Sequence, residues 1–520
     1  MSVIVETSAG KVEGLEQDRL KVFKGIPYAA PPIGDRRWLP PQPLEAWTGV
    51  RQAQSFGKVA PQNPSAPEVA ALFPGFDIAG PQSEDCLYLN VWSPGLDDAR
   101  RPVMVWIHGG GFTIGASSQE PYEGSTLAKR GDVVLVSINY RLGPFGFLNL
   151  NEVTGGRIPA TGNEGMLDQI AALEWVRDNI AAFGGDPGNV TIFGESAGGM
   201  SVGVLLGMPR ARGLFHKAIA QSGSNQGLEL DRAVRIAERF LSVLHLDASD
   251  VDTLCSSAVQ QWLAAVEELG VLQFPPRDSE IGGMPLQPVV DGKLLPALPL
   301  DAVANGSADG VIVMAGSNLE EWKILGPMDP GLATLDEPGL MEHLCMTIPP
   351  GNAQVLVEGY RETRARRGAP TTPGELFLAI QTDQIFRIPA VRLVEALHRR
   401  NQSAYNYLFT WRSPFQGGVL GACHMLEIGF VFGTYTMSDA GAAFSGSGPA
   451  AEALAEKMQD TWLAFAHTGD PSCDSLGSWP TYGDKRETMM FGEQCAIEEA
   501  PYDEERRAWE SVPNAVVTML

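Results

Sequence analysis

The feature that most constrains the fold is an alternation of short apolar runs with helical stretches. Runs rich in valine and isoleucine lie at 103–107, 133–138, 190–193, 217–220 and 311–315, with a later candidate at 405–411. Between the second and third runs, apolar residues recur at helical spacing from Leu167 to Ile180, and Asn163 can cap the start of that helix. Buried strands that alternate with helices are typical of a sheet covered on both faces. We therefore expect an α/β fold with a large, mostly parallel central sheet flanked by helices.

The composition predicts a folded acidic protein. Of the 520 residues, 44% are hydrophobic and 19% are charged, and the net charge is −24. A surface of this sign repels nucleic acid and anionic membranes, so we expect neither as a partner. The chain shows no apolar run long enough to span a membrane, and its start lacks the pattern of a signal peptide.

The cysteines are scattered without the spacing of a metal site. They are Cys86, Cys255, Cys345, Cys423, Cys473 and Cys495. Thiols spread in this way are typical of a reducing compartment. We expect a cytoplasmic protein with no metal.

A serine between glycines follows the third apolar run. Gly194-Glu195-Ser196-Ala197-Gly198 can form a sharp strand-to-helix turn that exposes the serine hydroxyl. The pattern G-x-S-x-G is weak evidence, because residues 199–203 match it too, with Ser201 at the centre. Ser201 falls inside the expected helix, so Ser196 is the stronger candidate nucleophile. A plain glycine-rich turn at Ser196 is the alternative.

A glycine-rich stretch also follows the first apolar run. The residues after 103–107 are His108, three glycines at 109–111 and Phe112. Their backbone N–H groups, together with that of Ala197, can bind an oxyanion. A phosphate-binding loop would need a lysine and a following serine or threonine, which this stretch lacks. We expect His108 to order the loop rather than to act as the base.

A catalytic serine needs a base and an acid that orients it. Among the seven histidines, His424 is the candidate base, because it lies in a glycine-flanked loop after the run 405–411. The other histidines lie on expected helices or beside strands: His216, His245, His343, His398 and His467. Glu320 and Glu321 follow the run 311–315 and are candidate acids. Their spacing does not decide between them, and both can also be solvated carboxylates at a helix start.

Taken together, these stretches resemble the type-B carboxylesterases of the carboxylesterase/cholinesterase family, in particular its bacterial p-nitrobenzyl-esterase-like members. The similar stretches include FKGIPYAAPPIGDRRW (23–38), SEDCLYLNVW (83–92), WIHGGGF (106–112), NYRLGPFGFL (139–148), GNEGMLDQIAALEWV (162–176), TIFGESAGG (191–199), QSGS (221–224), PVVDGKLLP (288–296) and CHMLEIGFVFG (423–433). The resemblance implies a single α/β-hydrolase domain over residues 1–520. It also implies inserted helices and loops around the active-site gorge, with a helical insertion around 325–385.

The resemblance implies a Ser-Glu-His triad that needs no cofactor. Its nucleophile, acid and base fall on Ser196, Glu321 and His424. It assigns the oxyanion hole to the N–H groups of Gly110, Gly111 and Ala197, and it places Glu195 and Ser222 in support behind the site. Trp322 stands directly after the acid, where the family usually has glycine.

The expected substrates are small uncharged carboxylic esters with modest acyl chains, in a pocket lined in part by Phe112 and Trp322. An amide or carbamate hydrolase with the same triad is the first alternative. A non-catalytic binding protein on this fold is a remote one, because such relatives typically lack the serine. The loop before Cys86 has no tryptophan for a choline ester. The resemblance also implies that secreted members of the family close a disulfide at the position of Cys86, but Ala60 stands at the expected partner position here. We expect activity to rise through the pKa of the histidine, near 6.5 when unperturbed.

Overall fold

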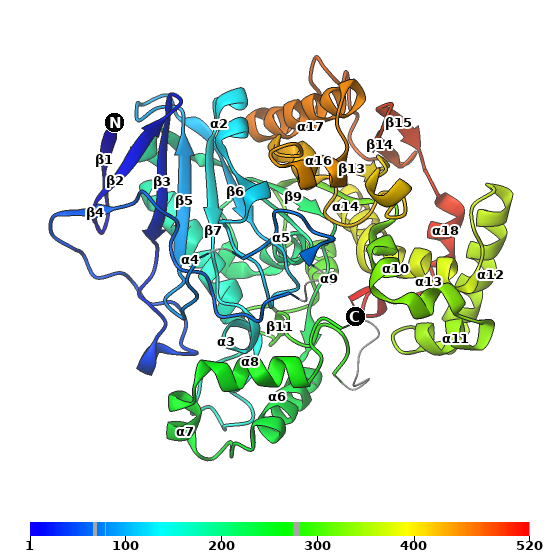
Figure 1. The fold of residues 1–520 in the computed structure, drawn as a ribbon, viewed down its shortest axis with the longest axis horizontal. Coiled ribbons are helices and arrows are strands. Elements are labelled where there is room, and N and C mark those ends of the chain that lie inside the picture. The colour runs from blue at the N-terminus through cyan, green and yellow to red at the C-terminus, as the bar shows by residue number, and fades with distance from the viewer. Residues whose placement is uncertain (66–69, 79, 274–280, 519–520) are drawn as a thin grey trace.

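A large mixed sheet runs through the molecule in the computed structural model (Figure 1). The structure describes residues 1–65, 70–78, 80–273 and 281–518. The strand order is β1-β2-β3-β5-β7-β6-β8-β9-β12-β13-β14-β15, and β4 pairs with β2 beside this path. The strands are β1 (Ser2–Thr7), β2 (Gly10–Gln17), β3 (Leu20–Pro27), β4 (Val50–Gln52), β5 (Tyr88–Ser93), β6 (Arg101–Ile107), β7 (Val134–Ile138), β8 (Gly185–Glu195), β9 (Lys217–Gln221), β12 (Ile312–Asn318), β13 (Ala404–Phe409), β14 (Glu487–Phe491) and β15 (Ala496–Glu499).

The central strands are parallel, from β7 through β6, β8, β9, β12 and β13 to β14. Each apolar run that was expected to form a strand overlaps one of them, so the expected mostly parallel sheet is confirmed. The N-terminal edge β1-β2-β3-β5 is antiparallel, as is β15 at the other edge. These strands were not predicted, because exposed polar residues interrupt the apolar runs of β1, β2 and β15, and Asn90 interrupts that of the buried strand β5.

Helices cover the sheet and extend beyond it. They are α2 (Ser125–Gly131), α3 (Gly143–Phe147), α4 (Glu164–Asn179), α5 (Ala197–Gly207), α6 (Leu230–Leu244), α7 (Val251–Ser256), α8 (Val259–Glu268), α9 (Pro299–Ala304), α10 (Leu325–Met328), α11 (Glu337–Cys345), α12 (Pro350–Arg366), α13 (Pro373–Thr382), α14 (Ile388–Arg399), α15 (Ile428–Phe432), α16 (Asp439–Ser445), α17 (Pro449–Thr468) and α18 (Asp503–Ala508). A separate two-stranded ribbon pairs β10 (Leu228–Glu229) with β11 (Val289–Val290). Within the described residues, no helix is both long and apolar enough to cross a membrane.

The expected helix after Asn163 is α4, but its cap differs from the expectation. Asn163 occupies the position before the helix, yet its side chain does not cap it. The amide instead donates to the carbonyl of Val289 and accepts from the N–H of the same residue. A tertiary contact has therefore replaced the local one.

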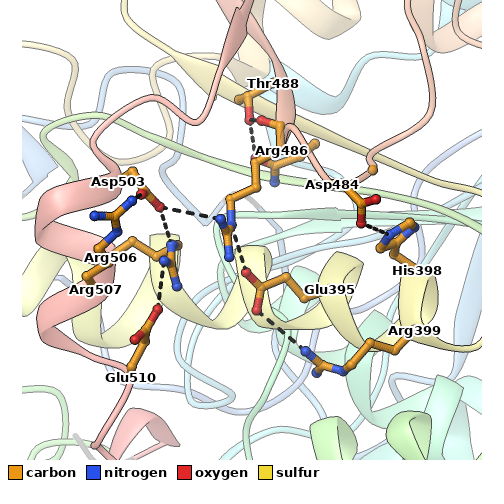
Figure 2. A network of polar contacts seen from close by, with 12 residues as sticks. Glu395, His398, Arg399, Asp484, Arg486, Thr488, Asp503, Arg506, Arg507 and Glu510 are labelled. Carbon is orange, nitrogen blue, oxygen red and sulfur yellow. Dashed lines mark hydrogen bonds and ion pairs between the residues drawn. The ribbon is translucent and has the colours of Figure 1, made fainter.

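Helices fill the chain between β12 and β13. Helices α10 to α14 and a π-helical turn, η7 (Asp383–Arg387), occupy this segment, and α11 to α13 lie beside α18 on the right of Figure 1. Figure 2 shows the ion pairs that connect α14 to the C-terminal part of the chain. Glu395 of α14 contacts Arg399 on the same helix and Arg486 before β14. Asp503 of α18 contacts Arg486 and Arg506. Linked charges of this kind hold the C-terminal part of the chain against α14.

Candidate active site

Ser196 stands at the end of β8, at the point where the chain turns into α5. Its φ of 56° and ψ of −126° are rarely adopted by a residue with a side chain. This conformation presents the serine at the carboxyl edge of the parallel strands, and its side chain is partly exposed. The local geometry is that of a strained nucleophile turn.

The flanking glycines of this turn are required by close backbone contacts. A Cβ on Gly198 would lie 2.0 Å from the carbonyl oxygen of Ile107 in β6, and a Cβ on Gly194 would lie 2.6 Å from that same oxygen. Both distances are too short for any side chain to be accommodated. The neighbouring strand therefore dictates the small residues that the sequence shows.

His424 lies in the loop before α15, and its imidazole contacts the carboxylate of Glu321. Its Nδ1 is 2.7 Å from Oε2 of Glu321, which is fully buried. The second carboxylate oxygen of Glu321 accepts the N–H of Asn318 at 2.7 Å, and the N–H of His424 donates to the carbonyl of Glu321 at 3.1 Å. The acid and the imidazole thus hold each other in one orientation, with a proton on Nδ1.

The adjacent carboxylate, Glu320, points elsewhere. It accepts the N–H of Ala422 at 3.0 Å and pairs with Lys323 at 2.7 Å and with Arg412 at 2.9 Å. Burial is the largest single influence on the pKa of Glu320 and would raise it. The contacts with Lys323, the N–H of Ala422 and Arg412 together outweigh burial and lower the pKa of Glu320. The structure therefore distinguishes the two carboxylates, which the spacing along the chain could not do.

Glu195, the residue before the serine, lies on the other side of the imidazole. Its Oε1 is 3.2 Å from Nε2 of His424, and the side chain is fully buried. Burial raises the pKa of Glu195 well above its usual range, although the nearby imidazole opposes this. For His424, burial alone would lower the pKa, but Glu195 and Glu321 outweigh it and raise it to about 9. The site thus favours the protonated imidazole.

A third buried carboxylate, Glu427, was missed by the sequence analysis. It accepts hydrogen bonds from Asn318 at 2.7 Å and from Gln221 at 3.1 Å. Burial raises the pKa of Glu427 most, and the charge of Glu321 raises it further. Its position in the sequence, a few residues after His424 and before a short helix, gave no sign of this role, because acids are common at helix starts.

The loop after β6 forms one wall of the site. Gly110 and Gly111 have φ values of 111° and 57°, and they line a cavity together with Ser196. Ala197 is the first residue of α5, so its N–H has no acceptor within the helix. The Nδ1 of His108 donates to the carbonyl of Gly109 at 2.8 Å, and burial lowers the pKa of its ring to about 4. It is stacked on Tyr140 and orders the loop.

The cavity has a volume of about 230 Å³ and contains both Ser196 and His424 in its wall. Trp322 lines it, but Phe112 is not among its described lining residues. Phe112 is instead fully buried with its ring 4.8 Å from that of Phe147, so this expectation is corrected. Apolar side chains form most of the wall, including Phe73, Phe76, Ile114, Met200, Leu272, Met284, Ile324, Leu325, Met328, Phe386 and Met425.

The remaining predicted residue, Ser222, is buried at the end of β9 with a φ of 49°. Its N–H donates to the carbonyl of Gly316, and within the described part of the chain its hydroxyl makes no hydrogen bond. None of the other histidines joins the site: His398 contacts Asp484, His467 contacts Gly131, and His343 contacts Gly339. Across the described ranges, no cluster of three or more His, Cys, Asp or Glu residues has the arrangement of a metal site.

Known proteins share this fold and much of this sequence. The model of the carboxylesterase family matches residues 1–509. A para-nitrobenzyl esterase of Bacillus subtilis (strain 168) is 37% identical over 508 residues, which cover 97% of this chain and 98% of that protein. A phenmedipham hydrolase of Pseudarthrobacter oxydans is 34% identical, over 95% of this chain and 96% of that one.

A solved structure of a Geobacillus stearothermophilus carboxylesterase superposes with a TM-score of 0.86 at 39% identity, covering 98% of this chain and 100% of the other. A solved para-nitrobenzyl esterase gives a TM-score of 0.81 at 36% identity, over 97% of this chain and 99% of the other. Both likenesses extend over nearly the whole chain. The chain belongs to the carboxylesterase family and is a carboxylic-ester hydrolase with the α/β-hydrolase fold.

Proposed function

We propose that Ser196, Glu321 and His424 are the catalytic triad and that the amides of Gly110, Gly111 and Ala197 form the oxyanion hole. The observation that carries this proposal is the 2.7 Å contact between Nδ1 of His424 and Glu321, in a cavity whose wall also contains Ser196. We further propose that residues 1–520 act as one domain, with the helical segment around 325–385 forming part of the gorge.

In the proposed cycle, His424 takes the proton of Ser196 as the serine oxygen attacks the ester carbonyl. The N–H groups stabilise the oxyanion of the tetrahedral intermediate, each contributing about 3 kcal/mol. The imidazolium then protonates the leaving alcohol, while Glu321 holds the ring in the required tautomer. Water, deprotonated by His424, hydrolyses the acyl-enzyme.

We propose uncharged esters with modest acyl chains as the substrates. The cavity volume of about 230 Å³ and its mostly apolar wall support this class. Apart from His424, the described lining residues include one acidic or basic side chain, Asp77, which is exposed. An anionic acyl group would lose its hydration against this apolar wall, and the described lining residues include no lysine or arginine to pair with it.

The test is burst kinetics with p-nitrophenyl butyrate. Wild type is expected to release about one nitrophenol per active site before steady turnover, and Ser196→Ala is expected to show no burst. Equal slow turnover by both proteins would remove Ser196 from the chemistry and favour a non-catalytic binding protein.

The same triad can hydrolyse amides or carbamates, so the leaving group has to be tested separately. The matched substrates are the p-nitrophenyl ester and the p-nitroanilide of butyric acid, which share an acyl group. We expect kcat/KM for the ester to exceed that for the anilide by at least about 10³, because the proposed triad makes no contact that would favour an amide nitrogen over an ester oxygen. Comparable values would favour the amidase alternative.

We also propose a cytoplasmic location. All six cysteines are free thiols, and Cys86 is fully buried. Burial raises the pKa of its thiol and makes it unreactive. Thiol titration of the protein denatured directly from cells should count six free groups, and a lower count would argue for an oxidising compartment.

A further inference from the structure

Phe386 packs against the imidazole of His424. The two ring centroids are 4.8 Å apart, and the planes are tilted by 36°. Trp322 contacts both rings, with its centroid 5.2 Å from Phe386 and 6.2 Å from His424. Phe386 and His424 both line the cavity, so the two rings meet in its wall.

An unusual helical turn aims Phe386 at the imidazole. Phe386 belongs to the π-helical turn η7, which precedes α14. Pro389 lies in the first turn of α14 and has no N–H to donate backwards, which explains why the helix widens at this point. A wider turn rotates the side chains relative to α13, and π-helical turns recur at functional sites.

Buried polar contacts fix the turn. Asp383 and Arg387, at its two ends, form a buried ion pair in which Nε of Arg387 lies 2.7 Å from Asp383. Tyr360 of α12 donates a hydrogen bond to Asp383, and the indole of Trp509 donates to the hydroxyl of Tyr360 at 2.7 Å. Leaving any one of these groups unpaired would be costly, so the turn is held rigidly.

The same turn is connected to the loop that carries the acid. The N–H of Trp322, next to Glu321, donates to the hydroxyl of Thr382 at 3.1 Å. Gln384 donates to the carbonyl of Val516 near the C-terminus at 2.8 Å. One buried helical junction therefore positions both aromatic rings beside the triad.

We propose that Phe386 is a positioning residue, which holds the imidazole of His424 toward Ser196 and stabilises the imidazolium through its ring face. An aromatic face within about 6 Å attracts a cation, and the attraction grows when water is excluded. This proposal rests on the proposed triad, because it assigns to Phe386 an action through His424.

The charged groups around the imidazole are the carboxylates Glu321, Glu195 and Glu427. Asp383 and Arg387, which flank Phe386, neutralise each other. A substitution at Phe386 leaves all of these groups in place. A change in the pH profile therefore reports the loss of the ring.

The experiment measures burst and steady-state kinetics with p-nitrophenyl acetate from pH 5 to pH 10 for Phe386→Leu, Phe386→Tyr and Phe377→Leu. Phe377 is the matched control, because it lies on α13 and packs on a different histidine, His343, at 5.5 Å. The burst amplitude counts competent sites, so rates per site are independent of any misfolded fraction.

We expect Phe386→Leu to lower the inflection of kcat/KM by about half a pH unit and the acylation rate per site by about tenfold. Phe386→Tyr keeps the ring face and should restore both values, and Phe377→Leu should match wild type. An unchanged or raised inflection in Phe386→Leu would overturn the proposal. If Phe386→Leu shows no competent sites, Phe386→Met, of similar volume, is judged by the same two criteria.

Failure of this inference is distinguishable from failure of the proposed function. A wild-type burst that disappears in Ser196→Ala upholds the triad, and an unchanged inflection in Phe386→Leu then overturns the role of Phe386 alone. A wild type without a burst overturns both proposals.

Discussion

Two adjacent segments match the same G-x-S-x-G pattern, yet the fold uses them differently. Residues 194–198 form the turn from β8 into α5, and Ser196 at its centre is partly exposed to the cavity. Residues 199–203 lie within α5, and Ser201 is fully buried, accepting a hydrogen bond from Gln169 at 3.0 Å. A serine is made available as a nucleophile by its place at a strand end, and the pattern alone does not provide this.

The same contrast separates Glu321 from Glu320 and His424 from His108. In each pair the residue types are equal, but one member takes part in the contact between His424 and Glu321, and the other makes polar contacts with a neighbouring loop. Four predictions test how far these differences extend.

The largest effect is expected at the two serines. Ser196→Ala should lower kcat by about 10⁴- to 10⁶-fold, because the nucleophile is lost while binding and the oxyanion hole remain. Ser201→Ala should stay within about threefold of wild type. Active-site titration followed by steady-state kinetics measures both, and similar losses in the two variants would break the comparison.

The next effect is expected at the two glutamates. Glu321→Gln should lower kcat by about 10³- to 10⁴-fold, because an amide stabilises the wrong imidazole tautomer and no longer stabilises its charge. Glu320→Gln should cost less than about tenfold, since it alters only the contacts to Lys323, Arg412 and the N–H of Ala422. If Glu320→Gln lost more activity than Glu321→Gln, the assignment of Glu321 as the acid would be wrong.

The third prediction concerns pH. The proposed cycle requires a neutral imidazole, and Glu195 and Glu321 raise the pKa of His424 above its ordinary value against the effect of burial. The kcat/KM profile should therefore rise with pH through an inflection above about 6.5, rather than at the unperturbed value. Glu195→Gln removes one negative neighbour and should move the inflection to lower pH. An inflection that stays in place would show that Glu195 is uncharged throughout.

The smallest effect is expected on stability, with opposite signs at the two serines. Ser196→Gly relieves a backbone with a φ of 56° and should raise the free energy of unfolding by about 1 kcal/mol. Ser201→Gly places glycine inside a helix and leaves the amide of Gln169 without its acceptor, so it should lower that free energy by about 2 kcal/mol. Chemical denaturation measures both, and equal signs would argue against strain at Ser196.

Much of the fold and part of the site could be predicted from the sequence, because the signals were local. The apolar runs, the glycines around Ser196 and those after His108 each report a requirement of neighbouring residues. The antiparallel edge, the contact of Asn163 with Val289 and the burial of Phe112 against Phe147 could not be predicted in this way. Each depends on a partner that lies elsewhere in the chain.

The sequence by itself determined where the strands lie, which serine can occupy a strained turn and which loop can offer unpaired amides. The spacing of the residues left Glu320 and Glu321 open, the resemblance selected Glu321 and placed Glu195 behind the site, and the structure shows both of these carboxylates against His424. Only the tertiary structure decided that Glu427 joins the buried charges and that Phe386 packs on the imidazole. The physical reason is that backbone conformation is set by residues close in sequence. The pairing of buried charges and rings is set by segments that only folding brings together.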